Sequence, residues 1–164
     1  MKNSKSLMIA RMGITATLYV LTTVVFAPIS VGPVQFRISE ALCILPLVFP
    51  ECAIGLTIGC VISNLALSTP LDVLIGGFAT FVSGLLTLWI GLKIKNDMIK
   101  LIVGALPPIL INALLVPLTF LVFTDGFVGY AINVSTVFIG QLTTIGTLGT
   151  LIYFSLLKHK NKGK

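Results

Sequence analysis

Eight residues of this largely apolar chain have side chains that could recognise a small molecule. They are three ionisable groups, four amides and one tyrosine: Arg37, Glu40, Asp72, Asn64, Asn112, Asn133, Gln141 and Tyr130. Amides and carboxylates match the donor and acceptor edge of a heterocycle, and a carboxylate facing an amidine or guanidine edge forms paired, charge-assisted hydrogen bonds. These residue types indicate a neutral or cationic ligand and argue against a nucleotide or a sugar phosphate.

Arg37 and Glu40 lie three residues apart, and two interpretations of this pair stay open. The two side chains could simply pair with each other. Alternatively, one of them contacts a ligand, since loop residues at the mouth of a pocket often carry recognition. We favour ligand contact, with Phe36, Phe127 or Tyr130 as candidate rings that stack on the ligand.

The other polar residues also have a structural interpretation, because single amides and hydroxyls often form hydrogen bonds between membrane helices. Polar groups inside a bilayer are costly when unsatisfied, so they normally face the interior of a helix bundle. For Asn112 the two interpretations remain equal. A shared pocket that opens outward is favoured for a larger set: Glu40, Asp72, Asn64, Asn133 and Gln141.

The elements that must position these residues follow from the composition. Hydrophobic residues make up 56% of 164 positions, charged residues make up 10%, and the mean hydropathy is +1.09. Soluble domains carry about 25% charged residues, so we predict an all-α integral membrane protein. Four apolar runs are long enough to span a bilayer. Together with two shorter segments between them, they predict one transmembrane domain, 1–164, with six helices at residues 8–29, 38–50, 52–67, 71–92, 99–123 and 129–157.

The basic residues predict the topology. They form three clusters: Lys2, Lys5 and Arg11; Lys93, Lys95 and Lys100; and Lys158, Lys160, Lys162 and Lys164. The positive-inside rule places all three clusters, and both termini, in the cytoplasm. Residues 39–67 must then cross the membrane twice with a turn at Pro50–Glu51, although each leg is shorter than a full span. Pro28 directly after Ala27 is a poor cleavage context, so we interpret the first apolar run as a retained helix.

Small residues recur at the spacing of helix–helix contacts. Gly55, Gly59 and Ser63 form one ladder, and Gly77, Gly84 and Gly91 form another; we expect both to pack inside the protein. The first helix has a flat face of small residues, which could pack internally or dock to another membrane subunit: Ala10, Gly13, Ala16 and Thr17.

Several function classes are disfavoured. The net charge of +6 and the pI near 9.5 could suggest nucleic acid, but the basic residues are better explained as topology anchors. The sequence has no P-loop or dinucleotide fingerprint, so the chain is not expected to hydrolyse ATP itself. Three cysteines without metal-binding spacing are expected to be small packing residues. We expect no metal, no cofactor and no catalytic residue.

Three stretches resemble a known family: "APISVGPVQFRISEALCILP", "GLTIGCVISNLALSTPLDVLIGGFAT" and "ALPPILINALLVP". They are similar to the QueT family, which are substrate-binding S-components of energy-coupling factor (ECF) transporters. The resemblance implies a six-helix bundle in the bacterial cytoplasmic membrane that binds a vitamin-like solute from outside. It also implies work with a transmembrane coupling subunit and two cytosolic ATPase subunits. The substrates associated with the family are 7-deazaguanine precursors of queuosine, such as queuine.

The sequence departs from the family pattern at two places. S-components often carry an Ala-xxx-Ala face on the first helix, whereas Ala10 is followed four residues later by Ile14. Gln141 occupies a position where family members tend to have glutamate. A neutral amide can still bind a base edge, so this difference bears on which base is bound and not on the class of ligand.

Two other classes of function remain. An ion-coupled secondary transporter could use Glu40 and Asp72 as coupling acids, and its uptake would survive loss of ATPase subunits but fail with an uncoupler. No inverted repeat or pair of broken helices supports this class. A scaffold protein without a ligand would show no thermal stabilisation by any small molecule.

Overall fold

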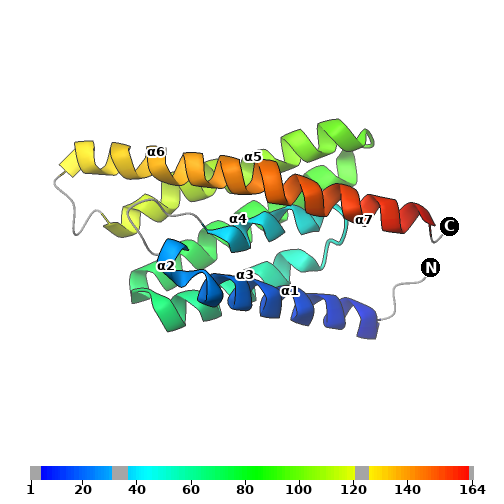
Figure 1. Cartoon of the computed structure of the whole chain (residues 1–164), viewed down its shortest axis with the longest axis horizontal. Coiled ribbons are helices and arrows are strands. Elements are labelled where there is room, and N and C mark those ends of the chain that lie inside the picture. Colours follow the sequence, from blue (N-terminus) through cyan, green and yellow to red (C-terminus); the bar gives the residue numbers. More distant parts are fainter. Residues whose placement is uncertain (1–4, 31–36, 121–125, 163–164) are drawn as a thin grey trace.

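The protein is a bundle of six helical rods, and the predicted number of helices is confirmed (Figure 1). The computed structural model describes residues 5–30, 37–120 and 126–162, and these residues contain no strand. Five rods are α1 (Lys5–Val25), η1 (Ile38–Leu47), α3 (Cys52–Leu67), α4 (Pro70–Lys93) and α5 (Asp97–Leu115). The sixth joins α6 (Gly126–Thr144), η3 (Ile145–Gly149) and α7 (Thr150–Lys162). Two short helices, α2 (Ala27–Ser30) and η2 (Val116–Phe120), follow α1 and α5.

Four of the rods are long and apolar enough to cross a membrane. They cover Lys5–Val25, Pro70–Lys93, Asp97–Thr119 and Phe127–His159, and they support a multi-pass membrane protein. η1 and α3 are shorter and meet at the expected turn around Pro50–Glu51. η1 is a 3-10 helix of 10 residues, which makes it about 20 Å long. The hydrocarbon core of a bilayer is about 30 Å thick, so η1 cannot span it alone.

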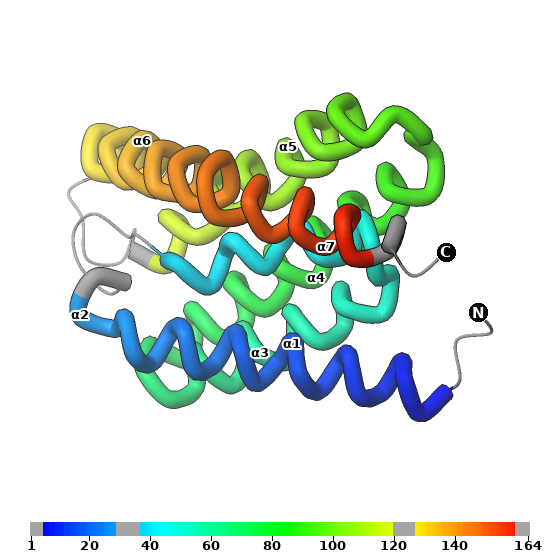
Figure 2. The backbone as a smooth tube through the Cα atoms, turned by 45° about the vertical axis from the view of Figure 1, so that its right-hand side comes forward, coloured from blue at the N-terminus to red at the C-terminus, as the bar shows by residue number. Residues whose placement is uncertain are grey.

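η1 occupies the interior of the bundle. α1 packs on α3, α3 on α4, α4 on α5 and α5 on α6, while η1 contacts all five of these helices and α7. η1, cyan in Figures 1 and 2, lies between a layer that contains α1 and α3 and a layer that contains α5 and α6. Its first turn carries the buried polar residues Ser39 and Glu40, whereas Ile44 and Leu47 join an apolar core with Tyr153.

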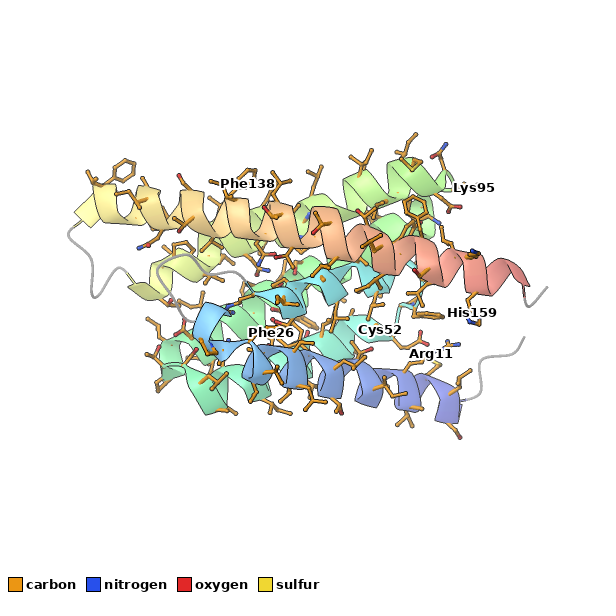
Figure 3. The ribbon with its side chains drawn as sticks, viewed as in Figure 1. Arg11, Phe26, Cys52, Lys95, Phe138 and His159 are labelled. Carbon is orange, nitrogen blue, oxygen red and sulfur yellow. The ribbon has the colours of Figure 1, made fainter. Side chains whose placement is uncertain are left out.

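One end of the bundle carries the described residues of the three basic clusters. α1 begins and α7 ends at the same end, where α4 also turns into α5 (Figure 1). Arg11, Lys95 and His159 lie at this end in Figure 3. The fold therefore brings the described members of the three basic clusters to one side, as the positive-inside rule requires of a cytoplasmic face.

Both glycine ladders pack inside the protein, as predicted. A methyl group added to Gly55 would lie 2.6 Å from the carbonyl oxygen of Met12 on α1. The same group at Gly91 would lie 2.9 Å from the Cα of Leu47 on η1. Gly59 makes a comparable approach to Tyr19 and Ala16 on α1, and Gly77 lies close to the side chain of Val61. Gly84 is in ordinary contact with Ala53, at 3.4 Å. Gly55, Gly59 and Gly91 therefore bring backbones into close contact, which is how helices associate in a bilayer.

Local sequence signals set the bounds of α4. Thr69 and Asp72 form a capping box, and Pro70 follows the N-cap, where its missing N–H costs nothing. α4 ends at Lys93, and a short turn leads to α5. At the start of α5, the Oδ1 of Asn96 accepts hydrogen bonds from the backbone of Met98 and Ile99. These two caps fix where α4 and α5 begin.

Two prolines interrupt the backbone hydrogen bonding of α5. Pro108 has no N–H, so the carbonyl of Gly104, four residues earlier, loses its helical donor. The hydroxyl of Thr87 on α4 donates to this carbonyl at 3.0 Å. The proline is therefore tolerated because a neighbouring helix satisfies the freed carbonyl.

Candidate functional site

The buried carboxylate of Glu40 is the centre of the candidate site. Glu40 is 2% exposed. The hydroxyl of Tyr19 on α1 donates to its Oε1 at 2.6 Å, and the amide of Asn112 on α5 donates to its Oε2 at 3.0 Å. The thiol of Cys43, one turn along η1, also donates to Oε2 at 3.0 Å. Three elements of the bundle therefore converge on one carboxylate.

No cation pairs directly with this carboxylate among the described residues. Their ion pairs are Arg11 with Glu51 and Lys100 with Asp97, both at the basic end of the bundle. Arg37 is half-buried and close enough for its charge to act on Glu40 and Asp72, yet it forms no ion pair with Glu40, which was the alternative to ligand contact that the sequence left open. A buried carboxylate held by neutral donors alone is costly, so a ligand with donor groups would stabilise it.

Asp72 and Asn64 meet at the turn between α3 and α4. The Oδ2 of Asp72 accepts from the Thr69 hydroxyl at 3.0 Å and from the Thr69 backbone at 3.3 Å. The amide of Asn64 donates to the backbone oxygen of Asp72 at 2.9 Å. Gly76 leaves room for this amide, since a methyl group there would lie 2.7 Å from the Asn64 nitrogen. These contacts hold the α3–α4 turn together and leave one Asp72 oxygen, Oδ1, without a bond in this network.

The remaining predicted residues lie on α6 or outside the described part of the chain. Tyr130 donates its hydroxyl to the carbonyl of Leu114 at 2.8 Å, which ties α6 to α5. Asn133 is half-buried, and Phe127 is largely exposed. Gln141 is buried, and its Oε1 has no hydrogen-bond partner. Phe36 lies outside the described residues. The structure therefore brings Glu40 and Asn112 into direct contact and joins Asn64 to Asp72. The two pairs are not bonded directly, but Asn64 also donates to the Sγ of Cys60 at 3.6 Å, and Cys60 packs in one buried cluster with Tyr19, the partner of Glu40.

The small residues of α1 divide between two environments. Ala16 packs against α3, since a methyl group at Gly59 would lie 3.2 Å from its Cα. Gly13 faces open space, with no atom within 4 Å of an added methyl group. Ala10 and Thr17 are exposed as well. Ala16 is thus part of the internal packing, whereas the other three residues leave a flat strip uncovered.

Sequence reasoning missed two contacts of Glu40. Tyr19 was not singled out, although a tyrosine deep in an apolar span needs a partner for its hydroxyl, and that need was the available signal. The cysteines were expected to be packing residues only, and this expectation was incomplete. Cys43 donates to Glu40, and Cys52 accepts from Thr15 at 3.3 Å. Among the described residues, no cluster of His, Cys, Asp or Glu could hold a metal ion.

Known proteins resemble this chain in sequence. Residues 9–158 match the QueT transporter family. The queuosine precursor transporter QueT of Lactococcus lactis subsp. cremoris (strain MG1363) is 43% identical over 84 residues. That alignment covers 50% of this chain and 50% of the relative, so the chain matches half the length of the curated protein. No solved structure matches the chain. Because the family match extends over nearly all of the bundle, the protein belongs to the QueT transporter family.

Proposed function

We propose that this protein is the substrate-binding subunit of a transporter that takes up a queuosine precursor. The ligand is a flat 7-deazaguanine base such as queuine, bound from the side opposite the basic end. The observation that carries the proposal is the carboxylate of Glu40, which is buried in the bundle with three neutral donors and without a paired cation among the described residues. The family match and the name of the relative supply the class of ligand.

The chemistry of Glu40 fits the guanine edge of such a base. That edge presents two neighbouring N–H donors, and a carboxylate accepts two parallel bonds. A carboxylate has about four lone-pair sites, of which Tyr19, Asn112 and Cys43 occupy three. A thiol is a weak donor, so the Cys43 bond is the one that a ligand can replace. Tyr19 and Asn112 then orient the carboxylate while the base binds its open side.

Arg37 supplies a hydrogen-bond donor for the carbonyl of the base. The carbonyl of a guanine-type base is adjacent to its ring N–H, so a donor beside Glu40 would satisfy it. Arg37 is half-buried, acts electrostatically on Glu40 and forms no ion pair with it. Around this centre, the proposed site contains the other residues predicted from the sequence: Asn64, Asp72, Asn112, Tyr130, Asn133 and Gln141.

A direct binding experiment tests this site. The purified protein in lipid nanodiscs is titrated with queuine by calorimetry, together with Glu40→Gln and the control Glu51→Gln. Both residues are buried acids, but Glu51 pairs with Arg11 at the basic end. A charge-assisted bond contributes about 1.5–3 kcal/mol, so Glu40→Gln should weaken binding about tenfold or more. Glu51→Gln should leave the affinity unchanged. Equal affinity of wild type and Glu40→Gln, with both folded, would remove Glu40 from the site.

The energy source is proposed to be an ECF module, with a transmembrane coupling subunit and two cytosolic ATPase subunits. The strip formed by Ala10, Gly13 and Thr17 on α1 is uncovered and begins at the basic end, which we place in the cytoplasm. Gly13→Leu should therefore weaken co-purification with the ATPase subunits and leave queuine binding intact.

A cysteine at Asn96 should be protected from a membrane-impermeant thiol reagent in intact cells. Labelling at Asn96 would reverse the orientation.

An ion-coupled transporter is the second candidate, because Glu40 is a buried acid bonded to two further titratable groups, Tyr19 and Cys43. Uptake of radiolabelled queuine by cells that lack the ATPase subunits separates the two. Uptake that persists in these cells and stops with an uncoupler would favour ion coupling. Uptake that stops with loss of the ATPases supports the ECF module.

A further inference from the structure

Two buried side-chain oxygens on α6 have no hydrogen-bond partner. They are Oε1 of Gln141, whose residue is 4% exposed, and Oγ1 of Thr144, whose residue is 1% exposed. No other buried side-chain nitrogen or oxygen of the described residues lacks a partner. Native proteins satisfy nearly all such groups. Two orphaned oxygens three residues apart on one helix therefore mark a place where a partner is missing.

The Thr144 hydroxyl also departs from the behaviour of its neighbours. Hydroxyls in helices normally donate to the carbonyl four residues earlier. Thr143 and Thr147 do so at 2.8 and 2.6 Å, and Ser135 and Ser155 do so on the same rod. Thr144 makes no such bond. Residues three apart share one face of a helix, so the hydroxyl of Thr144 is available on the buried face that also carries Gln141.

This face belongs to the rod that packs against η1. Both α6 and η3 contact η1. A methyl group at Gly149 in η3 would lie 3.3 Å from the carbonyl oxygen of Ala41, the residue after Glu40. η3 is a π-helix that begins directly after Thr144, and π-helical turns are rare and frequently occur at functional sites. The orphaned oxygens thus lie on the rod whose irregular turn packs beside Glu40.

We propose that Gln141 and Thr144 bind a second hydrogen-bond donor of the ligand, separate from the base edge that Glu40 reads. This inference rests on the proposed function and narrows the substrate to a deazaguanine base that carries a donor on an arm, either an amine or a hydroxyl. The Oε1 of Gln141 is an uncharged acceptor, and the hydroxyl of Thr144 can accept as well as donate. Gln141 therefore selects a donor-bearing arm without demanding a charge, and Thr144 can accept from the same arm. Thr144 becomes a ligand-contacting residue that the sequence did not indicate.

The test compares two ligands and two variants. The ligands are 7-aminomethyl-7-deazaguanine, which carries a donor arm, and 7-deazaguanine, which has none. The variants are Thr144→Val and the control Thr87→Val. Thr87 is also fully buried, but its hydroxyl already has a partner, the carbonyl of Gly104. Affinities are measured by calorimetry in nanodiscs, and the stability of each ligand-free protein is measured by thermal unfolding.

Wild type should bind the base with the arm more tightly, and Thr144→Val should reduce that preference by roughly five- to tenfold. The variant should unfold at the same temperature as wild type or higher, because it removes an unsatisfied group. Thr87→Val should unfold at a lower temperature and keep the preference. If Thr144→Val does not fold, Gln141→Met provides the same measurement, and Thr144→Ser should retain the preference.

The possible failures are distinguishable. If wild type binds neither base, the proposed function is wrong. If wild type binds both bases and Thr144→Val keeps the full preference for the arm, the inference is wrong and the two oxygens hold only water. A fall in the unfolding temperature of both ligand-free variants, Thr144→Val and Gln141→Met, would also overturn it, because the two side chains would then have structural partners.

Discussion

The two sides of the bundle that enclose η1 are built differently. On one side, α1, α3 and α4 are regular helices whose backbones touch through glycines such as Gly55 and Gly59. On the other side, α5 contains two consecutive prolines, η2 is a 3-10 helix and η3 is a π-helix. Both unpartnered buried oxygens of the described residues lie on this second side, in α6.

The difference separates stability from recognition. Close packing and satisfied polar groups make the α1–α3–α4 side a rigid support for Tyr19, which holds Glu40. On the α5–α6 side, prolines and irregular helical turns break the regular helix pattern, and two buried oxygens lack hydrogen-bond partners. Proteins tolerate such departures mainly at functional sites. We therefore expect substitutions on the first side to affect folding most and substitutions on the second side to affect ligand binding most.

The largest effect is expected for Gly55→Val. Its first side-chain carbon would lie 2.6 Å from the backbone oxygen of Met12, and a backbone cannot move aside as a flexible side chain can. Overpacking of this kind costs about 1–3 kcal/mol and occasionally more. Thermal unfolding in nanodiscs should show a clear loss of stability. Gly13→Val, on the uncovered strip of the same rigid side, is the matched control and should unfold like wild type. Similar stability of both variants would mean that the α1–α3 contact is not the rigid part.

A smaller effect, on binding rather than folding, is expected for Gly149→Ala. The added methyl group would lie 3.3 Å from the carbonyl oxygen of Ala41, so η3 must shift slightly away from η1. A displacement that costs about 1 kcal/mol weakens binding roughly fivefold. Gly146→Ala, in the same π-helix, meets no atom within 4 Å and should bind queuine normally. Equal affinities in calorimetry would show that the spacing between η1 and η3 does not set the site.

The smallest effect is expected for Tyr130→Phe. The Tyr130 hydroxyl is already donated to the Leu114 carbonyl at a partly exposed position. Loss of one such bond costs about 0.5–1.5 kcal/mol of stability, and the affinity for queuine should change less than twofold. An affinity loss of tenfold or more in the same titration would instead place this hydroxyl against the ligand and extend the recognition side toward the start of α6.

The sequence predicted the features that depend on composition or on a short segment of the chain. Apolar length and the placement of lysines predicted the membrane class and the number of helices, and Pro50–Glu51 marked a turn. The partners of Glu40 could not be predicted in the same way. Asn112 is 72 positions away, and nothing in a single sequence distinguishes it from Asn133 as a partner. A direct Arg37–Glu40 pair was an alternative that rested on spacing alone, and in the fold Glu40 is instead bonded to donors from α1 and α5.

The irregular helices were also beyond sequence reasoning. The 3-10 winding of η1 and the π turn of η3 have the same apolar composition as ordinary helices, so they depend on packing against several neighbours at once. Thr144 illustrates the limit. It is a threonine in the same apolar helical segment as Thr143 and Thr147, so the sequence does not distinguish the three residues. Only the structure shows that the Thr144 hydroxyl has no partner.

The short, enclosed η1 has a consequence for how the protein is made. A segment of 10 residues is well below the roughly 20 residues that insert into a bilayer as an independent span. η1 must therefore enter together with α3 as a hairpin, and it brings a carboxylate into the hydrocarbon. Tyr19 has already been synthesised at that moment, but Asn112 has not. The second strong donor to Glu40 arrives only when α5 leaves the ribosome, so we expect the interior of the bundle to close late in biosynthesis.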